Sequence, residues 1–126
     1  DVSIARTLPT YGDQEGVHEI EALYLAIIEN TRSTLYLESQ YLASRTLAEA
    51  LAARLQEPDG PEIVLVLPRN ADGWLEQKAM DGARRALLHL LWDADVHGRF
   101  GAYYPVTEGG NPIYVHAKVV VMDESV

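Results

Sequence analysis

A histidine, a lysine and an aspartate near the end of the chain are of the right types, and at the right spacing, to act together on a phosphate ester. His116 and Lys118 stand two positions apart in the mostly apolar run Ile113–Met122, and Asp123 follows that run. Side chains two apart on a β-strand share a face, with their Cα atoms about 7 Å apart. Burying a cation in a strand is costly unless an anion meets it, and a phosphate is such an anion. An uncharged imidazole beside that phosphate could attack phosphorus or transfer a proton.

The position of Asp123 predicts a different role for its carboxylate. It is an odd number of positions from both His116 and Lys118, so it would face away from them on an unbroken strand. We therefore expect it at the end of the strand, bonded to a neighbouring loop. A plainer interpretation stays open for the other two residues. A single histidine in a strand is usually a hydrogen-bonded structural residue, and a single lysine usually extends to solvent.

The elements that must position these residues follow from the spacing of apolar residues, which alternates between the period of a strand and that of a helix. The alternation is typical of an α/β domain with a layered, mixed and largely parallel sheet flanked by helices. We expect the last two strands to pair as a hairpin, and the continuous apolar third strand to be covered on both faces. The predicted helices are Gly16–Thr31, Thr46–Glu57 and Trp74 to about Asp93, and the predicted strands are Val2–Leu8, Ser33–Gln40, Ile63–Leu67, Phe100–Tyr104 and Ile113–Met122.

Composition narrows the function classes. The chain has 126 residues, which suits a single domain, and it has no cysteine, which excludes a disulfide framework and a catalytic thiol. The formal net charge of -9 argues against broad, non-specific binding of nucleic acid, which needs clustered lysine and arginine. No apolar run approaches the roughly 20 residues of a membrane-spanning helix. Because the chain starts without methionine and stops three residues after Asp123, we expect a truncated fragment of a two-motif protein.

The motif and its flanks resemble those of the phospholipase D superfamily. Its HKD motif is His-x-Lys-x4-Asp, and Tyr114–Lys118 is similar to the family's Tyr-Val-His-Ser-Lys, in which two flanking residues precede the motif's histidine. Upstream, Leu35–Leu42 (Leu-Tyr-Leu-Glu-Ser-Gln-Tyr-Leu) is similar to the family's Ile-Tyr-Ile-Glu-Asn-Gln-Tyr-Phe strand, which precedes the second HKD motif. The chain departs from the family at Ser39, where asparagine is usual, and it ends before the expected Gly-Ser-x-Asn stretch. Ile63–Pro68 and Arg99–Pro105 match the family's middle strands in kind and order, and Arg6-Thr7 is a weaker similarity. The resemblance therefore spans nearly the whole chain.

The resemblance implies the C-terminal catalytic half of a bacterial phospholipase D or a cardiolipin synthase-like protein. In that family two HKD motifs meet, one histidine forms a phosphohistidine, and the other protonates the leaving alcohol. The match to the second motif makes His116 the general acid/base, Lys118 the phosphate-binding residue and Asp123 a supporting residue. Glu38 and Gln40 would point the same way, to orient a histidine or to reach the substrate.

This interpretation implies partners as well as residues. The substrate would be a phospholipid, and the partner would be the other HKD half, from the same chain or from a second subunit. No metal or cofactor is expected. We expect a cytoplasmic or peripheral membrane location in a bacterium. His97 with Asp93 and Asp95 suggests a metal site, but this pattern is common at the ends of helices.

Two alternatives remain. The first is an HKD nuclease or phosphodiesterase that works as a dimer, with the same chemistry. The second is a non-catalytic α/β interaction domain in which the histidine and lysine are structural. The sequence leaves open the head group, the choice between hydrolysis and transfer, and the oligomeric state. With one HKD motif, the isolated fragment is expected to be inactive.

Overall fold

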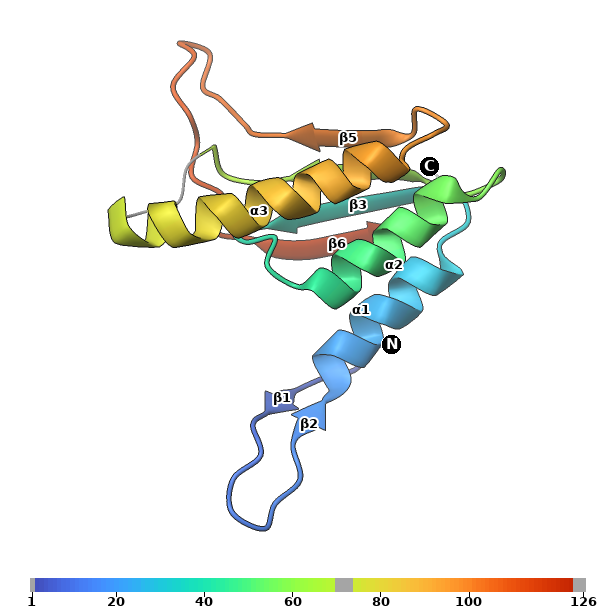
Figure 1. Cartoon of the computed structure of the whole chain (residues 1–126), viewed down its shortest axis with the longest axis vertical. Coiled ribbons are helices and arrows are strands. Elements are labelled where there is room, and N and C mark those ends of the chain that lie inside the picture. The colour runs from blue at the N-terminus through green and yellow to red at the C-terminus, as the bar shows by residue number, and fades with distance from the viewer. Residues whose placement is uncertain (1, 70–73, 124–126) are drawn as a thin grey trace.

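The chain has a mixed α/β architecture in which helices flank a four-stranded sheet (Figure 1). The computed structural model describes residues 2–69 and 74–123, and the side chains of the second range from residue 82 onward. The helices are α1 (Glu19–Asn30), α2 (Arg45–Gln56) and α3 (Trp74–Ala94). The strands are β1 (Thr7–Leu8), β2 (Val17–His18), β3 (Thr34–Ser39), β4 (Glu62–Val66), β5 (Phe100–Tyr103) and β6 (Lys118–Met122).

The sheet is largely parallel, with one antiparallel edge strand. Its order is β5-β4-β3-β6, where β3, β4 and β5 run parallel and β6 runs antiparallel to β3. The expected hairpin of the last two strands is therefore wrong, because β5 and β6 lie at opposite edges. The connecting segment, residues 104–117, closes on itself through a bridge between Val106 and Pro112. It is too long for the tight turn that joins the strands of a hairpin, and its length lets β6 reach the far side of β3.

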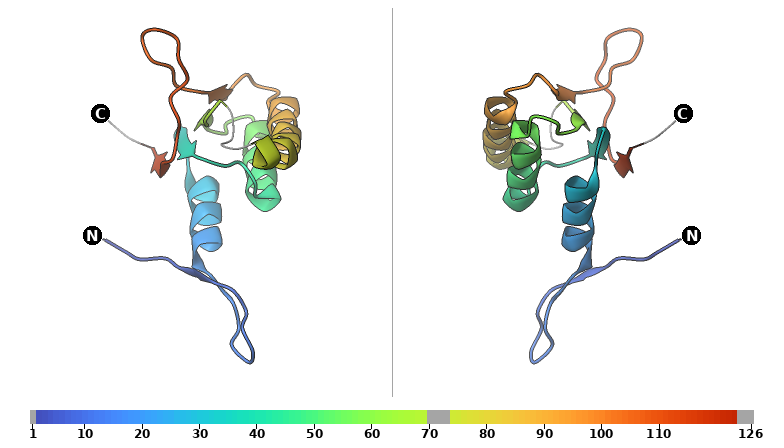
Figure 2. Two further views of the ribbon diagram at one scale, coloured as in Figure 1. Left: turned by 90° about the vertical axis from the view of Figure 1, so that its left-hand side faces the viewer. Right: turned by 90° about the vertical axis from the view of Figure 1, so that its right-hand side faces the viewer.

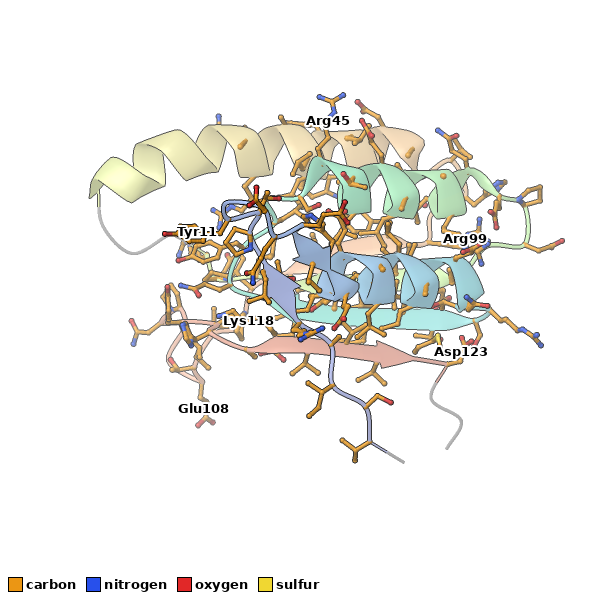
Figure 3. The ribbon with its side chains drawn as sticks, turned by 90° about the horizontal axis from the view of Figure 1, so that it is seen from below. Tyr11, Arg45, Arg99, Glu108, Lys118 and Asp123 are labelled. Carbon is orange, nitrogen blue, oxygen red and sulfur yellow. The ribbon has the colours of Figure 1, made fainter. Side chains whose placement is uncertain are left out.

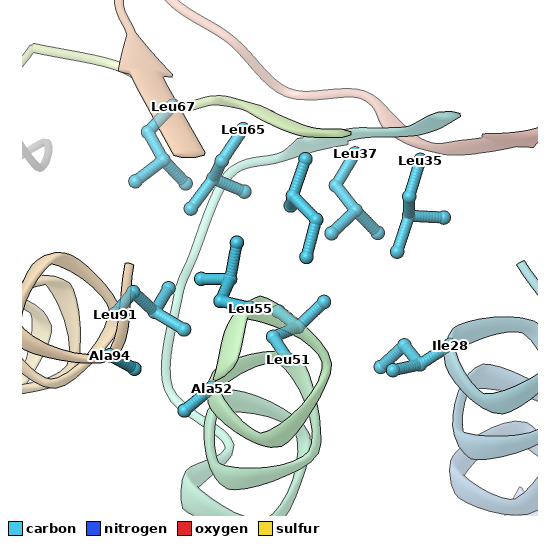
Figure 4. Close-up of a cluster of buried hydrophobic side chains, with 11 residues drawn as sticks. Ile28, Leu35, Leu37, Leu51, Ala52, Leu55, Leu65, Leu67, Leu91 and Ala94 are labelled. Carbon is cyan, nitrogen blue, oxygen red and sulfur yellow. The ribbon is translucent and has the colours of Figure 1, made fainter. Parts of the chain in front are cut away.

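All three helices lie on one face of the sheet, and the main core fills the space between the layers (Figures 2 and 4). Alternate residues of β3 and β4 enter that core, because successive side chains of a strand point to opposite faces. The prediction that Ile63–Leu67 is covered on both faces is wrong for the described part of the chain. Val64 and Val66 project from the opposite face and are half-buried. The buried core residues include Ile28, Leu35, Leu37, Leu51, Leu55, Ile63, Leu65 and Leu91.

Helix α2 has a polar start and a fixed end. The Ser44 hydroxyl accepts a hydrogen bond from the Leu47 amide at 3.3 Å, which caps the N-terminus. Past the other end, the Arg99 guanidinium donates to the carbonyl oxygens of Glu57 and Gly60. Carbonyl groups at the end of a helix have no hydrogen-bond partner within it. Arg99 provides donors to the carbonyl groups of the turn after α2 and so joins that turn to the start of β5.

The first part of the chain projects from the body as a hairpin (Figures 1 and 2). The expected strand Val2–Leu8 is reduced to its last two residues, which pair with β2. Because β2 occupies the residues before Glu19, helix α1 begins later than the expected Gly16. The Glu19 carboxylate accepts hydrogen bonds from the main chain and the guanidinium of Arg6. In the described ranges, no helix combines the length and the apolar character needed to cross a membrane.

Candidate active site

The residues of the predicted motif occupy both ends of β6. Lys118 is the first residue of the strand and Asp123 directly follows its last, as Figure 3 shows. The strand expected over Ile113–Met122 is thus shorter, and His116 lies in the irregular segment before it. The amide of Ile113 donates to the carbonyl of Pro105 at 2.9 Å. That bond holds Ile113 to the beginning of the connecting segment rather than to β3, which explains the late start of β6.

The ammonium group of Lys118 is held by two oxygens. Its Nζ donates to Gln40 Oε1 at 3.0 Å and to the main-chain oxygen of His116 at 3.1 Å. An ammonium group has three N–H donors. Within the described part of the chain these bonds use two of them, and the side chain is exposed. The cation is therefore fixed in place with one donor left for an incoming oxygen atom.

Gln40 is the residue that orients Lys118. It follows the end of β3 and is 9% exposed. Lysine can only donate, so the oxygen of the Gln40 amide must face Nζ. The amide nitrogen then donates to the hydroxyl oxygens of Tyr41 and Tyr114, each at 2.7 Å. Both the oxygen and the nitrogen of the Gln40 amide therefore have hydrogen-bond partners. These bonds link the segment that follows β3 to the segment that begins β6.

His116 presents its imidazole at the same end of β6. The side chain is exposed, and its ring stacks on the ring of Tyr114 with centroids 6.4 Å apart and planes at 21°. The chain bends so that the His116 carbonyl oxygen accepts from Lys118. The structure therefore brings together an accessible imidazole, a fixed ammonium group and a tyrosine. This set can exchange a proton and hold an anionic oxygen.

Glu38 makes a contact on the other face of the sheet. It pairs in register with Val119, whereas Lys118 pairs with Ser39, so Glu38 and Lys118 belong to opposite faces. The Tyr36 hydroxyl donates to the Glu38 carboxylate at 3.0 Å. Burial of the ring, followed by this bond and the carboxylate charge, raises the pKa of Tyr36. The expectation that Glu38 and Gln40 point the same way is wrong, since Gln40 lies beyond the strand and turns toward Lys118.

Asp123 lies where its position predicted, at the strand's end with its carboxylate on a neighbouring loop. The carboxylate accepts from the amides of Arg32, Ser33 and Thr34 and from the Ser33 hydroxyl, at 2.7 to 3.1 Å. These backbone donors, with Ser33 the strongest, hold the pKa of Asp123 well below its usual range. Its φ of 49° is in the left-handed region, which aspartate tolerates better than most residues. Asp123 therefore anchors β6 to the turn that begins β3.

Two tyrosines that were not predicted as site residues belong to this site. Tyr41 and Tyr114 both accept from Gln40, and Tyr114 also stacks on His116. Both stood inside the segments that resemble the family, which was the available signal. Their hydroxyl oxygens meet at one amide because the β3–β6 pairing brings the two segments together.

One of the two acidic residues considered for a metal, Asp95, has a structural contact. The Asp95 carboxylate accepts from the amides of Arg99 and Phe100, at 2.7 and 3.0 Å, and so fixes the turn between α3 and β5. Among the described residues no group of three or more histidine, aspartate and glutamate side chains is arranged to hold a metal ion.

The sequence was also compared with known proteins. No model of a protein family matches the chain, and no curated protein is significantly similar to it. The functional assignment therefore depends on the motif residues and their geometry.

Proposed function

We propose that this chain is the second-motif half of a phospholipase D-type enzyme, a phosphodiesterase or phosphatidyltransferase that acts on phospholipids through a phosphohistidine intermediate. The observation that carries this proposal is that the fixed ammonium group of Lys118 is linked, through Gln40 and Tyr114, to the accessible imidazole of His116. Gln40 holds the first of these groups and Tyr114 contacts the second. A purely structural histidine and lysine would not need this arrangement at an exposed end of a strand.

The proposed reaction divides the work between two histidines. The histidine of the partner motif attacks phosphorus, and a nitrogen–phosphorus bond forms as the bond to the leaving alcohol breaks. His116 in its protonated form gives that alkoxide its proton. Neutral His116 then takes a proton from water or from an acceptor alcohol, whose oxygen attacks phosphorus and releases the first histidine. Lys118 stabilises the negative charge on the non-bridging oxygens in both steps.

The charge of the chain favours a phospholipid over nucleic acid as the substrate. Of the charged residues, 19 are acidic and 10 are lysine or arginine. A nuclease holds a polyanion along several phosphates, so it needs a wide basic surface. A single phosphodiester bond between two organic groups needs only a local cation, and Lys118 provides one. The same charge balance would repel the chain from a strongly anionic membrane, so the proposal suits a zwitterionic head group best.

The test compares the full-length protein with its His116→Ala variant on phosphatidylcholine and on a chromogenic phosphodiester. Removing a general acid/base should lower turnover by about 100-fold or more. His18→Ala, which changes an exposed histidine of β2, is the matched control and should retain activity. Unchanged turnover by His116→Ala would remove the catalytic assignment. Cleavage of an oligonucleotide in place of the lipid would support the nuclease alternative.

A further inference from the structure

A hollow lies at the same edge of the sheet as Lys118, where β4 and β5 end against α3. Its volume is about 230 Å³, and its walls include Leu67, Leu88 and Ala102. Open α/β sheets bind ligands at the carboxyl ends of their parallel strands. Lys118 begins the antiparallel β6, so it lies at this edge too. The strand of Lys118 is two strands from β4, which places the two axes about 10 Å apart at a spacing of about 4.8 Å.

The described charged side chains of this hollow are cationic, unlike most of those in the chain. The whole sequence has a net charge of -9, yet the described residues that line the hollow include Arg69 and Arg84 and no aspartate or glutamate. Arg84 is engaged in contacts within the protein, so Arg69 is the cation of the hollow that a ligand can contact. Among the described lining residues the charged side chains are therefore cationic, on a protein that is acidic as a whole.

Arg69 presents its guanidinium group from the segment that follows β4. Its central carbon lies 5.5 Å from the centroid of the Tyr104 ring. A guanidinium group over an aromatic ring makes a cation–π contact, which uses none of its N–H groups as donors to oxygen. The ion pairs of the described residues join Arg6, Arg45 and Arg54 to glutamates, and Arg69 is not among them.

Arg84 fixes the main chain that carries Arg69. From α3 it donates to the carbonyl oxygens of Pro68 and Arg69, at 3.1 and 3.2 Å. The segment after β4 is thus tied to the helix before any ligand arrives, which lowers the entropy lost on binding. Tyr103 and Trp92 complete the wall and add side chains that can donate hydrogen bonds.

We propose that this hollow binds a phosphate group that carries an organic substituent. Arg69 provides the charge-assisted hydrogen bonds to phosphate oxygens, and the apolar and aromatic walls contact the substituent. The site is separate from Lys118 and does not need the phosphodiesterase proposal to be correct. If that proposal holds, the hollow selects substrates with a second anionic group. That group would lie about 10 Å from the scissile phosphate, which is the spacing of two strands.

The test is a titration of this chain with phenyl phosphate, followed by NMR through the amide, Arg69 Nε and Trp92 indole signals. Arg69→Gln should weaken binding about tenfold, because it removes a charge-assisted contact. Arg85→Gln is the matched control, since Arg85 is an exposed residue of α3 outside the hollow and the variant loses the same charge. It should bind within about twofold of the unchanged chain.

Each outcome of this titration decides the proposal. Equal weakening by both variants would show a general charge effect and overturn it. If Arg69→Gln fails to fold, the unchanged chain still tests the idea, because shifts confined to Arg69 and Trp92 support a site and shifts spread over the surface refute it. Inorganic phosphate then separates free phosphate from an organic phosphate, and vesicles of phosphatidylglycerol against phosphatidylcholine test a lipid source.

Discussion

The Nζ of Lys118 donates a hydrogen bond to Oε1 of Gln40 at 3.0 Å, across 78 positions of sequence. This contact joins the start of β6 to the end of β3, the two strands that pair at the candidate site. It fixes an exposed cation through a buried amide. Because the amide is satisfied on its other side by two tyrosine hydroxyls, the cation and the tyrosines form one bonded group.

The first prediction concerns this amide. Gln40→Leu keeps the approximate volume of the side chain and removes its bonds to Lys118 and to the tyrosines. We expect kcat of the full-length protein on a chromogenic phosphodiester to fall about 10- to 100-fold, because small misplacements of a catalytic group are costly. Gln56→Leu, which changes an exposed glutamine of α2, is the control and should keep kcat. Full activity of Gln40→Leu with an unchanged melting temperature would contradict the orienting role.

The second prediction concerns pH and Asp123. Its pKa in the fold lies below the value of about 3.9 for an unfolded aspartate. A lowered folded pKa means that the ionised carboxylate stabilises the fold above about pH 4 and that this stability is lost as the pH falls further. Asp123→Asn should therefore lower the denaturation midpoint clearly at pH 7 and much less near pH 2.

Urea unfolding of both proteins across that pH range measures the difference. Asp59→Asn, in the exposed turn after α2, is the control and should have a smaller effect at pH 7. A loss of stability in Asp123→Asn that is the same at pH 7 and at pH 2 would show that the charge of the carboxylate does not matter.

Local patterns predicted the helices and most strands to within a few residues. The exceptions are the shortened first and last strands and β2, whose residues were expected in a helix. They also predicted the place of Asp123, because the alternation of side chains along a strand and the end of an apolar run are both local features. The pairing of β6 was beyond such reasoning. Which edge a strand joins depends on the path of residues 104–117 and on the register of Leu37 with Val120, and these are contacts between distant residues.

The candidate site was predictable to the same extent. The types and spacing of His116 and Lys118 were visible in the sequence. The different directions of the Glu38 and Gln40 side chains were not visible there. Strand β3 ends at Ser39, and side chains no longer alternate between the two faces beyond that residue. Where a strand ends is the least certain feature of a sequence pattern, and here it decides which residue meets Lys118.

The third prediction tests the core between the sheet and α2. Leu55 is fully buried, whereas Leu23 of α1 is 47% exposed. Leu55→Ala should lower the free energy of unfolding by about 3 kcal/mol, because it removes apolar contacts and leaves a cavity. Leu23→Ala makes the same chemical change and should cost less than about 1 kcal/mol. Equal losses for the two variants in urea unfolding would mean that α2 does not pack on the sheet as described.

The last prediction concerns the turn that leads from α2 to β4. Gly60 lies so close to the carbonyl oxygen of Arg54 that a Cβ atom there would overlap it, and the overlapping atom belongs to the main chain. Neither group can move without disturbing the bonds that Arg99 makes to Glu57 and Gly60. Gly60→Ala should therefore destabilise the chain by about 2 kcal/mol, as overpacking does elsewhere.

Gly109→Ala is the matched control for this change. A Cβ at Gly109 would meet nothing closer than 3.9 Å, and its backbone is not in the left-handed region. Alanine there reduces the freedom of the unfolded chain, so the free energy of unfolding should stay equal or rise by less than about 1 kcal/mol. If both variants unfold at the same urea concentration, the close approach of Gly60 to Arg54 does not exist in solution, and the contacts of Arg99 would then need another explanation.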